Sequence, residues 1–390
     1  MTRNTLILSD AHLSAVLPDY ESGMHHRKDA CLFDEEIAAL LDRAILRSGL
    51  ADLEIVFNGD LFDFDAPPSS VHQTLIPDSI SHEQTGAVSV LEKILDDHPV
   101  FVRACGRVVC AGKKLVFVSG NHDAQMVFPL VRKTLANRIV DAALLYGQHD
   151  PKVLWKRILF RSFCYATDHG LHIEHGHAYD PFCVLGVHLP FESNGSVLIE
   201  RTVGSIASYY GPAILRDIYP YAANPLDVRA HDLVRSIWAR MLSGEVHPQW
   251  MAAAVASFLS HLSKVDVSAD PERMKLFCQK VAKECGLSEY SMVRQSQLFA
   301  QKSSAEQAIH EKSREEYGVL VDRAARDAMK AISDIHSSKA IVFGHTHVPW
   351  TGKHKRSLLG NSGSWSHKGG SHIWVESDPD GIAAFEVRTQ

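Results

Sequence analysis

The chain has 390 residues, of which 45% are hydrophobic and 22% are charged, a balance typical of folded globular proteins. Its 40 basic and 46 acidic residues give a net charge of −6, which argues against broad electrostatic binding to nucleic acid or to an anionic membrane. The seven cysteines include no C-x-x-C pair, no apolar run reaches the ~18 residues of a membrane helix, and no charged-then-apolar leader opens the chain. These features predict a reduced, cytoplasmic protein.

Five short apolar runs along the chain predict buried strands, and a polar turn follows each of them. The runs are residues 5–8, 54–57, 115–118, 171–174 and 340–343. A helical pattern covers residues 31–46, and residues 157–166 with 171–174 predict a hairpin. Three more strands are predicted at residues 358–359, 372–376 and 382–387, with a turn at 378–381. The carboxyl ends of strands in α/β proteins gather binding and catalytic groups, so we expect the five polar turns to converge.

Residues 179–339 have helical periodicity and almost no strand signal. Four apolar sets with helical spacing lie within residues 230–241, 251–262, 274–285 and 320–335. This pattern predicts a helical cap, inserted between a first core part, residues 1–178, and a last core part, residues 340–390. The cap is expected to shape a substrate pocket.

The five polar turns share one kind of chemistry: each offers carboxylate, amide or imidazole groups, and none offers a thiol. The turns are Asp10-Ala11-His12, Gly59-Asp60-Leu61-Phe62-Asp63, Gly120-Asn121-His122-Asp123, Glu174-His175-Gly176-His177 and Gly344-His345-Thr346-His347. Mixed oxygen and imidazole ligands suit Mn, Fe or Zn. The sequence therefore predicts a metal site where these strand ends meet.

In type and order the turns resemble the calcineurin-like metallophosphoesterase superfamily, whose pattern is D-x-H, G-D-x-x-D, G-N-H-D/E, a histidine before glycine, and G-H-x-H. The resemblance covers residues 1–177 and 340–390. It implies an α/β (α+β) fold, a four-layer αββα sandwich of two mixed sheets with a two-metal site at one edge, which here carries the large helical cap insertion.

The resemblance also implies a role for each residue of the turns. One divalent ion would be held by Asp10, His12, Asp60 and His347, and the other by Asp60, Asn121, His175 and His345. Two divalent ions, with Mn²⁺ favoured over Fe or Zn, would clamp a phosphoryl group and lower the pKa of a bridging water, so that hydroxide attacks phosphorus in line.

Residues around the ligands receive supporting roles. His122 would stabilise the developing charge or protonate the leaving oxygen, and Asp123 would orient His122. His177 and Asp63 are candidate substrate contacts. The alternative for His177 is a partner role beside the ligands, and the alternatives for Asp63 are a partner role behind the ligands and a simple turn carboxylate. Residues 361–365 resemble a short loop that many relatives carry after G-H-x-H, so we expect them to pack beside the site.

The sequence is compatible with several substrates. The turn at residues 59–63 resembles the UDP-2,3-diacylglucosamine diphosphatase branch, but that branch has arginine in place of His122 and H-G-D in place of residues 175–177. The main expectation is hydrolysis of a phosphoester or pyrophosphate in a small nucleotide-linked or lipid-linked substrate. The alternatives are a cyclic-nucleotide or general phosphodiesterase, a nuclease, and a non-catalytic metal-dependent scaffold. Nucleic acid is not expected as a partner, and peripheral membrane contact and oligomeric state are left open.

Overall fold

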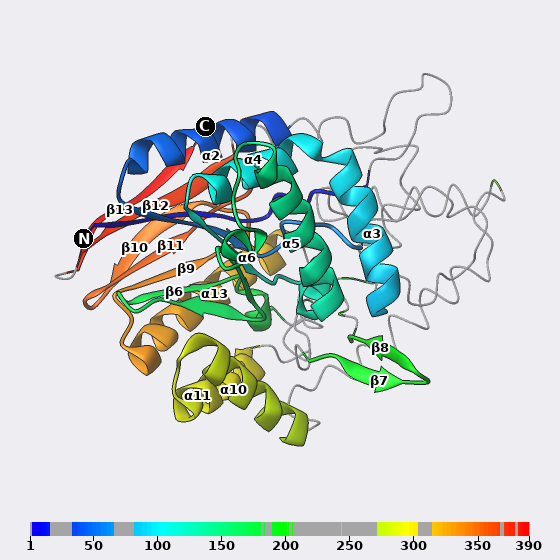
Figure 1. Ribbon diagram of the computed structural model, residues 1–390. Coiled ribbons are helices and arrows are strands. Elements are labelled where there is room, and N and C mark those ends of the chain that lie inside the picture. The colour runs from blue at the N-terminus through cyan, green and yellow to red at the C-terminus, as the bar shows by residue number, and fades with distance from the viewer. Residues whose placement is uncertain are drawn as a thin grey trace.

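The computed structural model describes residues 2–15, 33–65, 82–180, 189–200, 271–302, 314–366, 370–378 and 381–389, together with residues 183, 202, 205 and 243. This part of the chain is a mixed α/β structure with two mixed sheets and a separate two-stranded hairpin (Figure 1). All five predicted strands that precede polar turns are present. None of the described helices is both long enough and apolar enough to cross a membrane.

The first sheet has six strands in the order β13-β12-β1-β2-β3-β4. Its strands are β1 (Arg3–Leu8), β2 (Asp52–Asn58), β3 (Lys114–Val118), β4 (Ile158–Arg161), β12 (Ser371–Ser377) and β13 (Ile382–Thr389). The four strands from β1 to β4 run parallel, and β12 and β13 add to them in antiparallel pairs. Strands β12 and β13 confirm two of the three strands predicted near the end of the chain, and β11 (Ser357–Asn361) of the second sheet confirms the third.

The second sheet has five strands in the order β10-β11-β9-β6-β5. Its strands are β5 (Cys164–Ala166), β6 (Leu171–Glu174), β9 (Ala340–Phe343), β10 (Trp350–His354) and β11 (Ser357–Asn361). Strand β9 runs parallel to both β6 and β11. The central parallel strands β6 and β9 therefore end at the same edge, which is where two of the polar turns begin.

The predicted hairpin was wrong in its first half. Residues 157–166 do not form one strand, because the chain changes sheets at Ser162 and Phe163. Before that point β4 pairs in parallel with β3, and after it β5 pairs antiparallel with β6. The backbone N–H of Ser162 leaves the ladder and donates to Glu284 Oε1 over 2.8 Å. An unbroken apolar run in the sequence cannot show such a change of partner.

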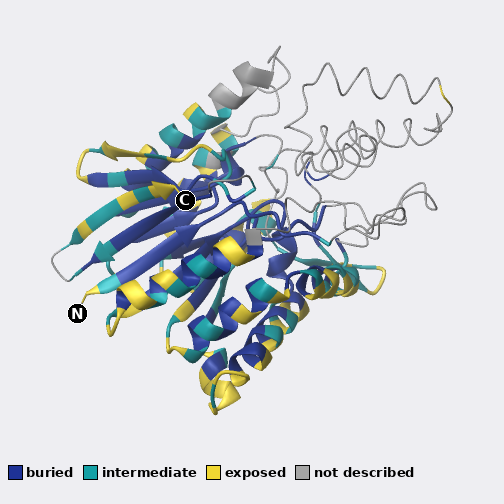
Figure 2. Cartoon of the chain, turned by 90° about the horizontal axis from the view of Figure 1, so that it is seen from above, coloured by how far each residue is buried: buried dark blue, intermediate teal, exposed yellow. Residues whose placement is uncertain are grey.

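Helices cover the outer face of each sheet. They are α2 (Phe33–Ser48), α3 (Gln84–Asp97), α4 (Pro99–Cys110), α5 (Pro129–Leu144), α6 (Pro151–Trp155), α10 (Pro271–Cys285), α11 (Glu289–Lys302) and α13 (Arg314–His336). Helix α2 confirms the helix predicted at residues 31–46. Short 3₁₀ turns, η1 (Ala124–Val127) and η2 (His177–Tyr179), follow two of the polar turns. The outward faces of the helices carry exposed residues, and the central strands between them are buried (Figure 2). The edge strands β10 and β13 are partly exposed.

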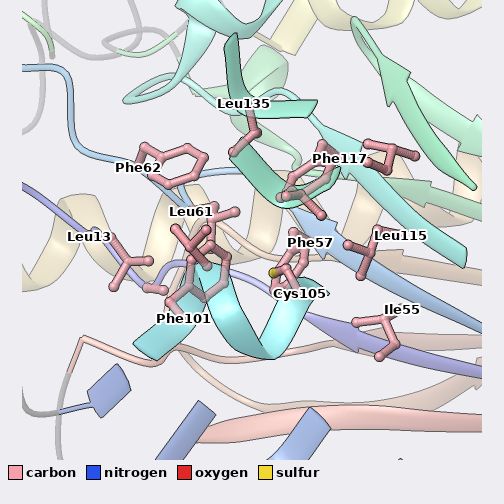
Figure 3. Packing of buried hydrophobic residues seen from close by; sticks show 14 of the residues in the cluster. Leu13, Ile55, Phe57, Leu61, Phe62, Phe101, Cys105, Leu115, Phe117 and Leu135 are labelled. Atoms are coloured by element: carbon pink, nitrogen blue, oxygen red, sulfur yellow. The ribbon is translucent and has the colours of Figure 1, made fainter. Parts of the chain in front are cut away.

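Three apolar clusters divide the interior according to the period-two alternation of the strands. Leu6 and Leu8 of β1 belong to the cluster beneath α2 to α5, where aromatic rings such as Phe57 and Phe101 meet (Figure 3). Ile7, between them, points the other way and joins a second cluster with Val342 of the other sheet. The two sheets therefore bury a shared apolar layer.

The third cluster lies between the five-stranded sheet and the helices of the predicted cap. Phe277, Met292 and Ile332 come from α10, α11 and α13, and they pack with Ile341 and Phe343 of β9. These helices match the sets predicted at 274–285 and 320–335, but they cover a core sheet. The sets at 230–241 and 251–262 lie outside the described residues.

The range predicted to be helical also contains a hairpin. Strands β7 (Phe191–Ser193) and β8 (Ser196–Leu198) pair antiparallel around Asn194 and Gly195, both of which have positive φ. The hairpin strands are only three residues each, too short for the alternating pattern that marks a strand in a sequence.

Candidate metal centre

The five polar turns come together at one edge of the molecule, where β1, β2 and β3 of the first sheet and β6 and β9 of the second sheet end. Backbone hydrogen bonds join the turns directly. The N–H of Asp10 donates to Gly59 O over 3.1 Å, and that of His12 donates to Asp60 O over 3.0 Å. In the second sheet, Gly344 N donates to His175 O over 3.0 Å. The prediction that the strand ends converge is confirmed.

Two groups of three side chains are arranged so that each could hold a metal ion. Asp10, His12 and His347 form one group, and Asp60, His175 and His345 form the other; within each, the ligand atoms lie within 4.8 Å of one another. The groups adjoin, because His175 Nε2 of the second lies 3.9 Å from Asp10 Oδ1 of the first. Each group is part of one of the two ligand sets that the resemblance implies, without Asp60 in the first and without Asn121 in the second.

The backbone at the ligands is strained in a consistent way. Among the described residues that are not glycine, eight have positive φ, and five of these are predicted ligands. They are Asp10 (58°), His12 (49°), Asp60 (50°), His345 (65°) and His347 (59°). The left-handed region is unfavourable for side-chain-bearing residues and is concentrated at functional sites. The strain aims carboxylates and imidazoles from sharp turns into a common space.

Several ligand atoms are buried without a hydrogen bond. His12 is 2% exposed, yet neither of its ring nitrogens makes a hydrogen bond within the described part of the chain. The side-chain oxygen Oδ1 of Asn121 is also buried without a hydrogen bond in that part of the chain. Burying such groups unpaired costs ~1–3 kcal/mol each, and a cation would remove that cost. This observation supports Asn121 and His12 as ligands.

His175 is held in one tautomer by the residue at the end of β2. Its Nδ1 lies 2.8 Å from Asn58 O, and its Nε2 lies 3.1 Å from Asp60 Oδ2. The side chain of Asn58 also donates from Nδ2 to Glu174 O over 3.0 Å. Asn58 therefore connects the two sheets and points Nε2 of His175 towards Asp60. No sequence pattern indicates this role, because Asn58 lies at the end of a strand, before the turn.

The pKa values at the centre are set by two effects, burial and the charges of neighbouring groups. Burial lowers the pKa of His12 to about 4, and neighbouring His122 adds to the effect. Burial opposes protonation of His175 too, but Asp60 and Asp10 outweigh it and raise its pKa to about 9. The carboxyl of Asp60 is also buried, yet His175 and His122 hold its pKa well below the usual range. Metal ligation requires ionised carboxylates and neutral imidazoles, so Asp60 and His12 are already in the ligating form.

His122 lies against the first metal group, with its ring centroid 4.7 Å from that of His12. Its Nδ1 lies 3.3 Å from Asp63 Oδ1 and 3.8 Å from Asp65 Oδ2. Burial by itself lowers the pKa of His122, but Asp60 and Asp63 outweigh it and raise that pKa to about 10. His122 is therefore well suited to carry a proton. It also forms a possible ligand group with His12 and Asp60.

The role predicted for Asp123 needs correction. Its carboxylate accepts hydrogen bonds from backbone amides, Gly120 N at 2.6 Å and Leu61 N at 2.9 Å. It therefore ties two turns together rather than orienting the ring of His122. Burial, together with the charge of Asp60, raises the pKa of Asp123 to about 7. The residue that contacts the His122 ring is Asp63, which is itself buried, so the structure favours its partner role over a substrate contact.

The remaining candidate substrate contact, His177, is buried beside the second group. Its ring centroid lies 5.4 Å from that of His175 and 6.4 Å from that of His345. It opens the short turn η2, directly after Gly176, which has a φ of 103°. Three residues on, Asp180 Oδ2 lies 2.9 Å from His345 Nε2. Sequence reasoning missed Asp180, because it stands outside the five turns.

The segment 361–365 packs beside the site, as predicted. Asn361 Nδ2 donates to Gly344 O over 2.6 Å, and Trp365 N donates to Asp10 O over 3.0 Å. The Trp365 side chain is fully buried, and its Nε1 donates to Ser371 O over 2.7 Å. This segment supports the backbone on both sides of the first group.

No protein-family model matches the chain, and a search of curated proteins finds no match. The case for a function therefore rests on the residues of the centre themselves.

Proposed function

We propose that the protein is a dinuclear metal-dependent phosphoester hydrolase of the calcineurin-like metallophosphoesterase superfamily. The observation that carries the proposal is the pair of adjoining three-ligand groups, Asp10–His12–His347 and Asp60–His175–His345, assembled from five strand ends. Asn121 supplies a further oxygen to the second group. A paired set of carboxylates and imidazoles without thiols fits two Mn²⁺ ions, with Fe or Zn as alternatives.

The arrangement of the clusters supports the four-layer form of the fold. The proposed order of layers is α2 to α5, the six-stranded sheet, the five-stranded sheet, and α10, α11 and α13, since the three apolar clusters join neighbouring members of this series. We propose that residues 1–178 and 340–390 are the core and that 179–339 are the insertion. Because α10, α11 and α13 bury the second sheet, the insertion supplies one of the four layers as well as a cap.

Two divalent ions, when bound, would polarise the phosphoryl oxygens and lower the pKa of an attacking water. The residues of the chain position these ligands and supply a proton donor. Asp60 of the second group also forms a possible ligand group with His12 of the first and with His122. Its Oδ1 accepts a hydrogen bond from His122 N over 2.7 Å. The His122 imidazolium, held by Asp63, is positioned to stabilise negative charge or to give a proton to the leaving oxygen. Burial of the ligands excludes water from them and strengthens these electrostatic effects.

The proposed substrate is a small phosphoester or pyrophosphate, nucleotide-linked or lipid-linked. A phosphodiesterase acting on cyclic nucleotides or other diesters remains the alternative. A panel of mononucleotide esters, cyclic nucleotides, UDP-sugar lipids and model diesters separates them, since each class presents a different leaving group to His122.

Hydrolysis of a chromogenic phosphodiester by the Mn²⁺-loaded protein tests the reaction class. We expect turnover that is lost on chelation, restored by Mn²⁺, and absent in Asp60→Ala. Asp141, an exposed carboxylate on α5, provides the matched control, and Asp141→Ala should behave as wild type. A protein that binds two ions but hydrolyses none of the panel would instead be a metal-dependent scaffold.

A further inference from the structure

The side chain of His345 has a partner that the ligand sets do not include. Asp180 Oδ2 lies 2.9 Å from His345 Nε2, and both side chains are less than one-tenth exposed. The segment that carries His175 also fixes Asp180, because the N–H of Asp180 donates to His177 O over 3.1 Å. Asp180 is thus anchored to the chain that supplies one ligand and contacts the side chain that supplies another.

A ring nitrogen that donates its proton to a carboxylate has no lone pair for a cation. With Nε2–H of His345 directed at Asp180, only Nδ1 of that ring is left to bind a metal. We infer that Asp180 is a positioning residue of the second metal group, which fixes the tautomer and the orientation of His345. The inference rests on the proposed metal centre and adds a residue to it.

In His175, the other imidazole of the same group, the opposite ring nitrogen has the outer oxygen partner. His175 presents Nε2 to Asp60, because its Nδ1 is held 2.8 Å from Asn58 O. In each imidazole of the second group, an oxygen acceptor outside the group occupies one nitrogen, so the other nitrogen is the one left to bind a cation. Outer acceptors of this kind orient metal-binding histidines and raise their basicity, and losing one typically costs ~10–100-fold in metal affinity.

His12, in the first group, has no such acceptor among the described residues. Loss of the Asp180 carboxylate should therefore weaken one ion selectively. This selectivity distinguishes a positioning role from a merely structural one, since general loosening of the fold would weaken both ions.

The experiment compares wild type with Asp180→Ala and Asp180→Asn, using Mn²⁺ titration calorimetry of the full chain. We expect Asp180→Ala to bind one ion as wild type does and the other ~10–100-fold more weakly. Asp180→Asn keeps an acceptor oxygen, so it should lose less affinity at the same ion. Asp141→Ala, the exposed carboxylate control, should match wild type. If Asp180→Ala does not fold, Asp180→Asn carries the test, since it must still weaken one ion and spare the other.

The outcomes separate this inference from the proposed function. Wild-type protein that binds fewer than two ions overturns both. Wild type with two ions, and Asp180→Ala and Asp180→Asn with the same two affinities, overturns the inference alone.

A direct alternative involves Cys183, which forms a possible ligand group with Asp180 and His345. If a cation sat in that group, Co²⁺-substituted protein would show thiolate-to-metal charge-transfer absorption that is lost in Cys183→Ser. That result would make Asp180 a ligand and overturn the positioning role. We expect no such band and unchanged Mn²⁺ affinities in Cys183→Ser.

Discussion

The backbone amide of His345 donates a hydrogen bond to Asp10 Oδ2 over 3.1 Å, and so joins the last polar turn of the chain to the first. The other oxygen of the same carboxylate, Oδ1, lies 3.1 Å from His347 Nε2. One oxygen of this carboxylate thus holds the last turn, and the other faces the first group of candidate ligands. Each metal group depends on contacts between turns that are far apart in the sequence, so single substitutions should have graded effects on metal content.

Asp60→Asn should cause the largest loss of metal of any single ligand substitution. Asp60 Oδ2 lies 3.1 Å from His175 Nε2, and the carboxylate also forms a possible ligand group with His12 and His122. Loss of its charge therefore weakens both ions, whereas Asp10→Asn should mainly weaken the one bound with His12 and His347. Elemental analysis after reconstitution with Mn²⁺ measures the stoichiometry. Two ions retained by Asp60→Asn would contradict a shared ligand, and Asp141→Asn serves as the carboxylate control.

His122→Gln should separate catalysis from metal binding. The Gln side chain cannot deliver a proton from a cationic acid, so we expect kcat to fall ~10²–10⁴-fold while two ions remain bound. The loss should be smaller for substrates with a good leaving group, such as a nitrophenolate, because they need little protonation. The comparison requires kcat and metal content from the same preparation. Loss of an ion in His122→Gln would assign His122 to the ligands instead.

The sequence predicts where the candidate ligands lie because they belong to short turns directly after apolar runs. A strand with four or five buried residues fixes where its turn begins. The convergence of parallel strand ends then follows from the sheet. Asp10, His12, His345 and His347 stand out on this basis, and the family resemblance adds Asp60 and His175 to the candidate ligands. The structure brings these six side chains into two groups.

Roles that depend on side-chain direction could not be obtained in this way. Asp63 and Asp123 are both carboxylates at the end of a turn, and nothing in the sequence shows that one faces a ring and the other faces amides. Asp180 and Asn58 act only through contacts made in three dimensions. The change of sheet at Ser162 was missed for the same reason, since periodicity reports burial but not the pairing partner.

Gly120→Ala should disrupt the centre although it removes no ligand. A Cβ at this position would lie 2.3 Å from Asp60 Oδ1 and 2.5 Å from Asp60 N, and neither atom can move without displacing the turn. We expect a lower free energy of unfolding, by ~1–3 kcal/mol as for other overpacked sites, and loss of metal. Gly381→Ala, where a Cβ would meet no atom within 4 Å, is the matched control. Normal metal content in Gly120→Ala would show that the turn tolerates a shift of Asp60.

His372 should make the fold sensitive to acid. It lies on β12, where burial and then the positive charges of Arg388 and Arg43 lower its pKa to about 4. In the unfolded chain the pKa of histidine is ~6.5, so between pH ~6.5 and ~4 the unfolded state binds the proton more readily. The free energy of unfolding contributed by this group is therefore present above pH ~6.5 and is lost as the pH falls towards 4, by at most ~1.4 kcal/mol per pH unit.

The substitution His372→Gln removes this titration, so the stability of the variant should fall less steeply with acid than that of wild type. Urea unfolding of both proteins at matched Mn²⁺ content, at several values from pH 8 to pH 4.5, measures the two slopes. Because the other titrating groups are common to both proteins, parallel curves would mean that His372 takes up its proton without unfolding the sheet.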